Sequence, residues 1–295
     1  MNSEKRDDLP VKWALRLIHY HALRHYIYPF LVRARRKTYD AGTFWESYYQ
    51  SAQAEELSDR VTVAHDANPW FSTFHYNSVE NLIIRFAADS NIDLQNAELL
   101  DVGTGTGHWL DFYRRLADFQ RLVGVDVSST AVEALQQQHL ADNDVDIRHY
   151  DVSADETLGT SCFDLINAIG VMFHLVNDDS WQNALRNVSH MLKPGGYFVV
   201  GGQFGWITRS VQFHNRDSFG DWSKYSSFVS LKDVFRLSSK DEVLVNKRIR
   251  SLRCWKRAAS QVGLKYVRVY RGRVPKSFIV PENNLLILQK PEDGP

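Results

Sequence analysis

Short apolar segments alternate with helix-like segments between residues 98 and 202, and this alternation limits the possible folds more than any other feature. Strands separated by helices run parallel, because each crossover helix returns the chain to the same edge of the sheet. A parallel sheet is covered on both faces, so its strands are apolar throughout. The expected strands are 98–102, 121–127, 145–150, 163–169 and 196–201, and the expected helices are 108–117, 131–140 and 180–192. A further helix is expected before this region, over 77–88.

The segment after residue 250 predicts an extension of this sheet. A helix is expected over 251–262, followed by strands over 265–270 and 284–289. The connection between these two strands is too short for a crossover helix, so we expect them to be antiparallel. Within the alternating region, residues 130–133 have the pattern of a capping box, which predicts a helix beginning there.

Composition restricts the class of protein. The chain has 295 residues, of which 44% are hydrophobic and 24% charged, which excludes collagen-like, low-complexity and fully disordered chains. No stretch approaches the roughly 18 apolar residues of a membrane span, and the first thirty residues lack a signal-peptide core. We therefore expect a cytoplasmic protein. Cys162 and Cys254 are too few for a disulfide framework and lack metal-ligand spacing, so both are expected to be reduced.

Charge is balanced in total but uneven along the chain. Lys and Arg number 35, as do Asp and Glu, yet residues 11–37 and 243–281 contain basic residues and no acid. These basic segments either pair with the acidic remainder of the chain or form a one-signed surface. Such a surface would suit an acceptor with phosphate or carboxylate groups, an anionic membrane or RNA.

Three alternate glycines, Gly103, Gly105 and Gly107, lie where the first expected strand turns into the first helix. Glycine allows positive φ and a close approach of a ligand to the main chain, and the helix N-terminus attracts polar groups. The loop therefore predicts a nucleotide-type site. The dinucleotide fingerprint needs another glycine where His108 stands, and the Walker lysine is absent.

At this point the sequence resembles the class I S-adenosylmethionine-dependent methyltransferases. The resemblance extends over residues 98–202 and rests on several matches in the family's order. They are Asp101 with the glycine loop, Asp126 at the end of the second strand, Asp151 at the end of the third, residues 163–175, and residues 190–197.

The resemblance implies a fold and a cofactor. The fold is an α/β, Rossmann-like seven-stranded sheet with helices on both faces and an antiparallel C-terminal hairpin. Residues 1–90 would form an N-terminal helical lid region, and residues 91–295 the methyltransferase domain, with an acceptor-side insertion at about 203–250. S-adenosylmethionine would be the cofactor. Asp126 would hold both ribose hydroxyls, as a carboxylate with two acceptor oxygens can, and Asp151 the adenine amino group. The implied cofactor-binding residues are Asp101, Gly103, Thr104, Gly105, Gly107, Asp126, Val127, Asp151, Val152, Ala168 and Ile169.

The family's reaction is an in-line displacement that depends on positioning, and an oxygen acceptor also needs a base. His174 is the candidate base, because it follows the fourth strand, whose end faces the transferred methyl group in this fold. A neutral imidazole is a suitable base near neutral pH. Alternatively His174 only packs against its loop, and His75 and His214 are weaker candidates. No carboxylate cluster has ligand spacing, so we expect no metal.

Aromatic residues from the lid region and the insertion predict an acceptor pocket that excludes water, although they could also only stabilise the fold. The candidate substrate-binding residues are Trp45, Tyr49, Tyr76, Phe173 and Trp206.

These features predict a methyltransferase that acts on a small-molecule acceptor, by O-methylation of a sugar, metabolite or natural-product intermediate. One alternative is a lipid-linked acceptor, with residues 11–37 lying on an anionic membrane. A second alternative is RNA, although the absence of a recognised RNA-binding module argues against it. A third is a protein acceptor, and a fourth is a methyltransferase fold that binds without turnover. The acceptor, the methylated atom and the oligomeric state are not identified by the sequence.

Overall fold

The computed structural model describes residues 36–37, 39–53, 69–138, 145–205, 208–211, 243–244, 247–272 and 284–292.

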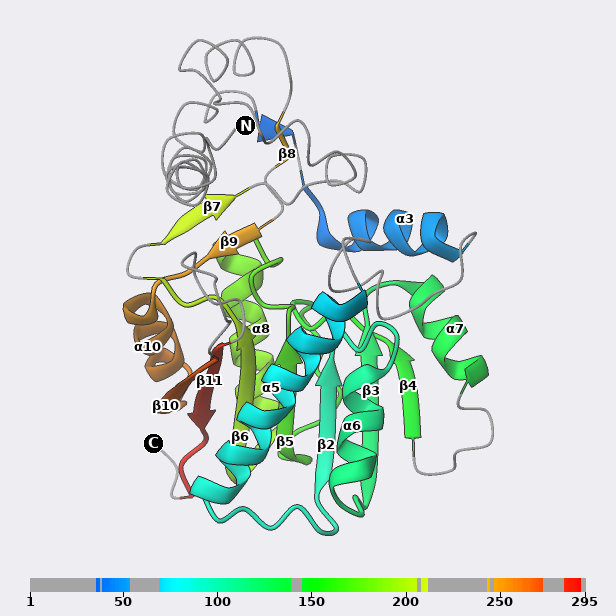
Figure 1. Ribbon diagram of the computed structural model, residues 1–295. Helices are drawn as coiled ribbons and strands as arrows, with labels where there is room; N and C mark the ends of the chain where they lie inside the picture. Colours follow the sequence, from blue (N-terminus) through cyan, green and yellow to red (C-terminus); the bar gives the residue numbers. More distant parts are fainter. Residues whose placement is uncertain are drawn as a thin grey trace, which may run out of the picture.

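The centre of the described structure is a seven-stranded sheet in the order β10-β11-β6-β5-β2-β3-β4 (Figure 1). The strands from β2 to β6 are mutually parallel, and β11 runs antiparallel to both of its neighbours. The strands are β2 (Glu98–Val102), β3 (Arg121–Asp126), β4 (Val145–His149), β5 (Phe163–Ile169), β6 (Leu192–Gly202), β10 (Lys265–Arg271) and β11 (Asn284–Gln289). The predicted Rossmann-like sheet with an antiparallel C-terminal pair is confirmed.

Helices cover both faces of the sheet. Their bounds are α5 (Pro69–Asp89), α6 (His108–Leu116) and α7 (Ser129–Gln138) on one face, and α8 (Asp178–Met191) and α10 (Leu252–Gln261) on the other. Successive strand residues point to opposite faces. Leu99 and Leu122 therefore pack with the first group of helices, and Leu100 and Val123 with the second. The two resulting cores explain why the central strands are apolar throughout.

Several elements differ from the prediction at their ends: β6 begins at Leu192 rather than at 196, and two helices differ as follows. The predicted helix 77–88 extends back to Pro69, and proline is well suited to a first helical position because its missing N–H would be unpaired there. The predicted start of α7 is wrong: Ser128, not Thr130, caps the helix, since the Ser128 hydroxyl accepts the Ala131 N–H at 3.2 Å.

The carboxyl edge of the sheet carries further elements. Helix α3 (Ala41–Gln53) lies over this edge near β3 and β4 in Figure 1. Two small sheets lie on the same side, one pairing β1 (Arg36–Lys37) with β8 (Val243–Leu244) and the other β7 (Arg209–Val211) with β9 (Lys247–Ile249). Most of the predicted insertion at 203–250, including Trp206 and His214, lies outside the described residues.

Candidate active site

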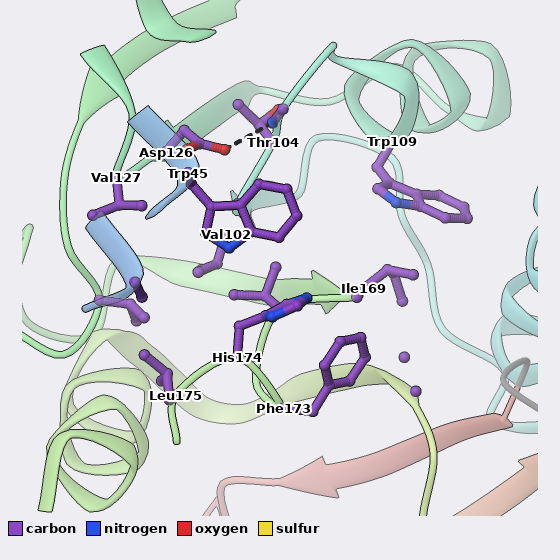
Figure 2. Close-up of a pocket in the computed structure, with 18 of the residues that line it drawn as sticks. Trp45, Val102, Thr104, Trp109, Asp126, Val127, Ile169, Phe173, His174 and Leu175 are labelled. Atoms are coloured by element: carbon purple, nitrogen blue, oxygen red, sulfur yellow. Dashed lines mark hydrogen bonds between the residues drawn. The ribbon is translucent and has the colours of Figure 1, made fainter. Parts of the chain in front are cut away.

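A cavity of about 200 Å³ opens at the carboxyl ends of β2, β3 and β5 (Figure 2). Its walls come from the glycine loop, from the segments after β3, β4 and β5, and from α3 and α5. Of the predicted site residues, the cavity is lined by Gly103, Thr104, Gly105, Asp126, Val127, Asp151, Val152, Ile169, Trp45, Tyr49, Tyr76, Phe173 and His174. The structure therefore brings most of the predicted site residues together around one cavity.

The glycine loop has the backbone geometry that its sequence predicts. Gly103, Gly105 and Gly107 have φ angles of 69°, 54° and 84°. The N–H groups of Gly103 and Thr104 both donate to the Val125 carbonyl, at 2.7 and 2.9 Å, which ties the turn to β3. A Cβ atom on Gly103 would lie 2.4 Å from Val171 Cγ2, so a side chain at this position would clash.

Asp126 is a fixed carboxylate at the cavity wall. It is 6% exposed, and its two oxygens accept the N–H of Gly105 at 3.0 Å and of Ser128 at 2.9 Å. Burial raises the pKa of Asp126, while these N–H donors act in the opposite direction. Each carboxylate oxygen has a second lone pair, so the group suits a ligand with two neighbouring hydroxyls.

Asp151 lies further along the same wall, at the end of β4. Its Oδ1 accepts both the backbone N–H and the hydroxyl of Ser153 at 2.8 Å, which fixes the orientation of the carboxylate.

Three predicted cofactor residues, Asp101, Gly107 and Ala168, are not among the residues that line the cavity. Asp101 is completely buried beneath the loop, where Asn167 Nδ2 donates to its Oδ1 at 2.6 Å. Burial raises the pKa of Asp101 to about 7. Its position indicates support of the loop from below rather than direct contact with a ligand.

Helix α3 closes one side of the cavity. It begins after Asp40, whose Oδ1 accepts the Thr43 N–H at 2.8 Å as a helix cap. Ala41, Trp45 and Tyr49 all line the cavity, because residues four apart share one face of a helix.

His174 lies at the far side of the cavity from the glycine loop, between two aromatic rings (Figure 2). Its imidazole is 4.9 Å from the Trp45 ring, edge to face, and 4.6 Å from the Phe173 ring, measured between centroids. The backbone N–H of His174 donates to the Val171 carbonyl at 2.8 Å, which closes the turn after β5. The residue is only 6% exposed. The predicted base is therefore enclosed and held in place.

Some lining residues were missed or only partly foreseen. Lys247 is 7% exposed, and its Nζ lies 4.2 Å from the centre of the Phe173 ring. His108 stacks on Tyr76 at 3.6 Å and contacts Glu80 at 3.1 Å, which joins α6 to α5 beside the loop. The sequence marked Lys247 only as part of a basic segment and His108 only as a mismatch to another motif. Gln203, Tyr150 and Trp109 also line the cavity, as does the weaker base candidate His75.

The donor set and the fold fit S-adenosylmethionine. The glycine loop allows a ligand to approach the main chain, Asp126 suits a ribose, and Asp151 follows the next strand along the same wall. The fold and the arrangement of these residues have the features of a class I S-adenosylmethionine-dependent methyltransferase.

Comparisons with known proteins agree with this class. Residues 100–198 match a family model described as a methyltransferase domain. The chain is 24% identical over 242 residues to the tRNA N(3)-methylcytidine methyltransferase trm140 of Schizosaccharomyces pombe, covering 74% of this chain and 73% of that protein.

The solved structures that share the fold include two methyltransferases with bound S-adenosylhomocysteine. One is the Burkholderia thailandensis 1,6-didemethyltoxoflavin N1-methyltransferase with bound 1,6-didemethyltoxoflavin and S-adenosylhomocysteine (15% identity, TM-score 0.55, 86% of this chain and 92% of that chain). The other is the N-methyltransferase NodS of Bradyrhizobium japonicum WM9 with S-adenosylhomocysteine (17% identity, TM-score 0.51, 83% and 99% of the chains).

The described ranges have two further properties. None of the helices there combines the length and apolar character of a membrane span. No three His, Cys, Asp or Glu side chains gather in those ranges as metal ligands would.

Proposed function

We propose that this methyltransferase transfers a methyl group to a hydroxyl of a small-molecule acceptor, with His174 as the general base. The observation that carries the proposal is the position of His174, which is buried on the cavity wall between Trp45 and Phe173 and across from the glycine loop.

Different residues of the chain have different roles in the reaction. The cofactor, when bound, supplies a methyl group already activated on a sulfonium. The glycine loop and Asp126 hold that molecule, and α3 with its aromatic face keeps water from the reacting atoms. The imidazole of His174 takes the proton from the acceptor hydroxyl as the new bond forms.

Among the residues that the structure describes, those on the acceptor side of the cavity are aromatic side chains together with the cationic side chain of Lys247. Trp45, Tyr49, Tyr76 and Phe173 provide flat apolar walls, which suit a small or planar molecule. Lys247 places a positive charge beside Phe173. An acceptor with a carboxylate or phosphate near its reactive hydroxyl matches this combination.

Substitution of His174 tests the assigned base. We expect His174→Gln to lower turnover about 10²–10⁴-fold, the usual contribution of a general base. S-adenosylhomocysteine affinity, measured by calorimetry, should stay within threefold, because the glycine loop and Asp126 are unchanged. The matched control is His190→Gln, an exposed histidine on α8. Turnover near that of the control would exclude His174 as the base.

The similarity to a tRNA methyltransferase supports a second candidate, an RNA acceptor. Methyl-labelled cofactor should be incubated with a panel of small hydroxyl compounds and, in parallel, with unmodified tRNA transcripts. Label in the small compounds supports the first proposal. Label in tRNA, with binding that weakens steeply with salt, would replace it.

The roles of residues 1–90 as a lid region and of about 203–250 as an acceptor-side insertion are part of the same proposal. Helix α3 and residues Gln203 and Lys247 at the cavity wall support it. Membrane contact through residues 11–37 remains a prediction, to be tested by flotation with anionic vesicles. Cytoplasmic localisation also remains a prediction.

A further inference from the structure

Glu46, on α3, reaches the start of α7. The hydroxyl of Ser128 donates to its Oε2 at 2.8 Å, and the hydroxyl of Thr130 donates to its Oε1 at 2.6 Å. The Thr130 N–H also donates to Oε2 at 3.3 Å. These donors, the Thr130 hydroxyl foremost, lower the pKa of Glu46 to about 2, so the carboxylate is ionised at neutral pH. A negative charge at a helix N-terminus is favourable.

Ser128 connects this contact to the cofactor site. Its backbone N–H donates to Asp126 Oδ1, while its side chain both donates to Glu46 and caps α7 through the Ala131 N–H. The second oxygen of Asp126 accepts the Gly105 N–H. A continuous series of hydrogen bonds therefore runs from α3 through Ser128 and Asp126 to the glycine loop.

The same helix lies close against the cofactor wall. A Cβ atom on Gly42 would stand 3.3 Å from Val127 Cγ2, which is tight contact. Trp45 and Glu46 are adjacent and so point about 100° apart around the helix. Trp45 faces the cavity and Glu46 faces α7, so the Glu46 contacts also fix the direction of Trp45.

We propose that Glu46 is a positioning residue for cofactor binding: it fastens α3 to the loop after β3, and so holds Trp45 and Asp126 in the arrangement that receives S-adenosylmethionine. It acts through Ser128 and Thr130 and touches no reacting atom. The proposal does not depend on which acceptor is used.

The test uses Glu46→Gln in the full chain, because glutamine keeps the shape and removes the charge. We expect the Kd for S-adenosylhomocysteine, measured by calorimetry without acceptor, to rise about tenfold, which corresponds to one charge-assisted hydrogen bond. In cofactor-free protein, hydrogen exchange over residues 41–53 should become faster. The matched control is Glu133→Gln, an exposed acid on α7, which should change neither measurement.

A second variant tests the route of the effect. Thr130→Val replaces the hydroxyl with a methyl group and so removes one donor to Glu46. If Glu46 acts through Thr130, the double variant should bind less weakly than the product of the two single effects predicts. A Kd for Glu46→Gln within twofold of the unmodified chain, or independent effects in the double variant, would overturn the proposal. If Glu46→Gln does not fold, an unchanged Kd in Thr130→Val overturns it instead.

Discussion

Asp101 shows how a single residue can make stability depend on pH. Its carboxyl is completely buried and accepts a hydrogen bond from Asn167, and burial raises its pKa to about 7. The carboxyl therefore remains protonated in the folded protein at pH values where the unfolded chain has already lost that proton. The folded state binds more protons than the unfolded state between these two pKa values.

The sign of the pH effect follows from this difference. The stabilisation due to Asp101 is complete below about pH 4 and is lost as pH rises toward 7, with a slope of up to about 1.4 kcal/mol per pH unit. Urea unfolding at several pH values should show that Asp101→Asn flattens this part of the profile. The same slope in both proteins would contradict the prediction.

At the scale of elements, the turn from β2 to α6 depends on Gly103. Alanine there would have to adopt φ 69° and place its Cβ 2.4 Å from Val171 Cγ2. We expect Gly103→Ala to lower the free energy of unfolding by about 2–4 kcal/mol, from backbone strain and overpacking together.

A matched control separates these two causes. Gly263 also has positive φ, at 77°, but its Cβ would meet nothing within 4 Å. Gly263→Ala should therefore lower the free energy of unfolding by the backbone part alone, about 1 kcal/mol. An equal decrease in the free energy of unfolding in the two variants, measured by urea unfolding, would show that the Val171 side chain moves aside at no energetic cost.

The elements themselves were largely predictable, because apolar runs and helical periodicity depend on residues close in sequence. Strands β2, β5 and β11 have the predicted ends. The position of the glycine loop and Asp126 at the cavity could also be predicted, since both follow strands directly. The cap of α7 was misplaced because Thr130 has the cap's chemistry but donates its hydroxyl to Glu46.

Contacts between distant parts of the chain could not be predicted in this way. Glu46 and Thr130 are 84 positions apart, and no local pattern indicates that they meet. Lys247 reaches the cavity only because β9 passes beside Phe173, whose carbonyl accepts the Arg248 N–H at 2.7 Å. Burial of Asp101 likewise depends on packing around the whole sheet edge.

At the scale of the molecule, the uneven charge is partly neutralised by pairing. Among the basic residues that the structure describes after position 243, Arg248 and Arg250 pair with Asp178, and Arg268 pairs with Asp89. Arg253, Lys256 and Arg257 on α10 are exposed. Pairing with acidic residues of the same chain therefore holds for part of the basic segment, and a one-signed surface on α10 stays a prediction.

The position of β11 makes the sheet depend on the last described strand. Residues Leu285 to Leu288 are completely buried, and β11 joins β6 to β10. A chain that ends after residue 283 should show no cooperative unfolding transition by circular dichroism, because β10 loses its only strand partner in the described sheet and both cores open. A chain that ends after residue 292 keeps every described strand and should fold. Cooperative unfolding of the shorter chain would contradict this.

The same position has a consequence for synthesis on the ribosome. When β6 has been translated, its outer edge has no neighbour until residue 289 emerges, on the order of ten seconds later at usual elongation rates. During that interval the nascent chain exposes an apolar strand whose backbone N–H and C=O groups are unpaired along one edge. Such edges promote aggregation. Slow translation after residue 202 would lengthen this exposure, and chaperones that bind extended apolar segments would have a target there.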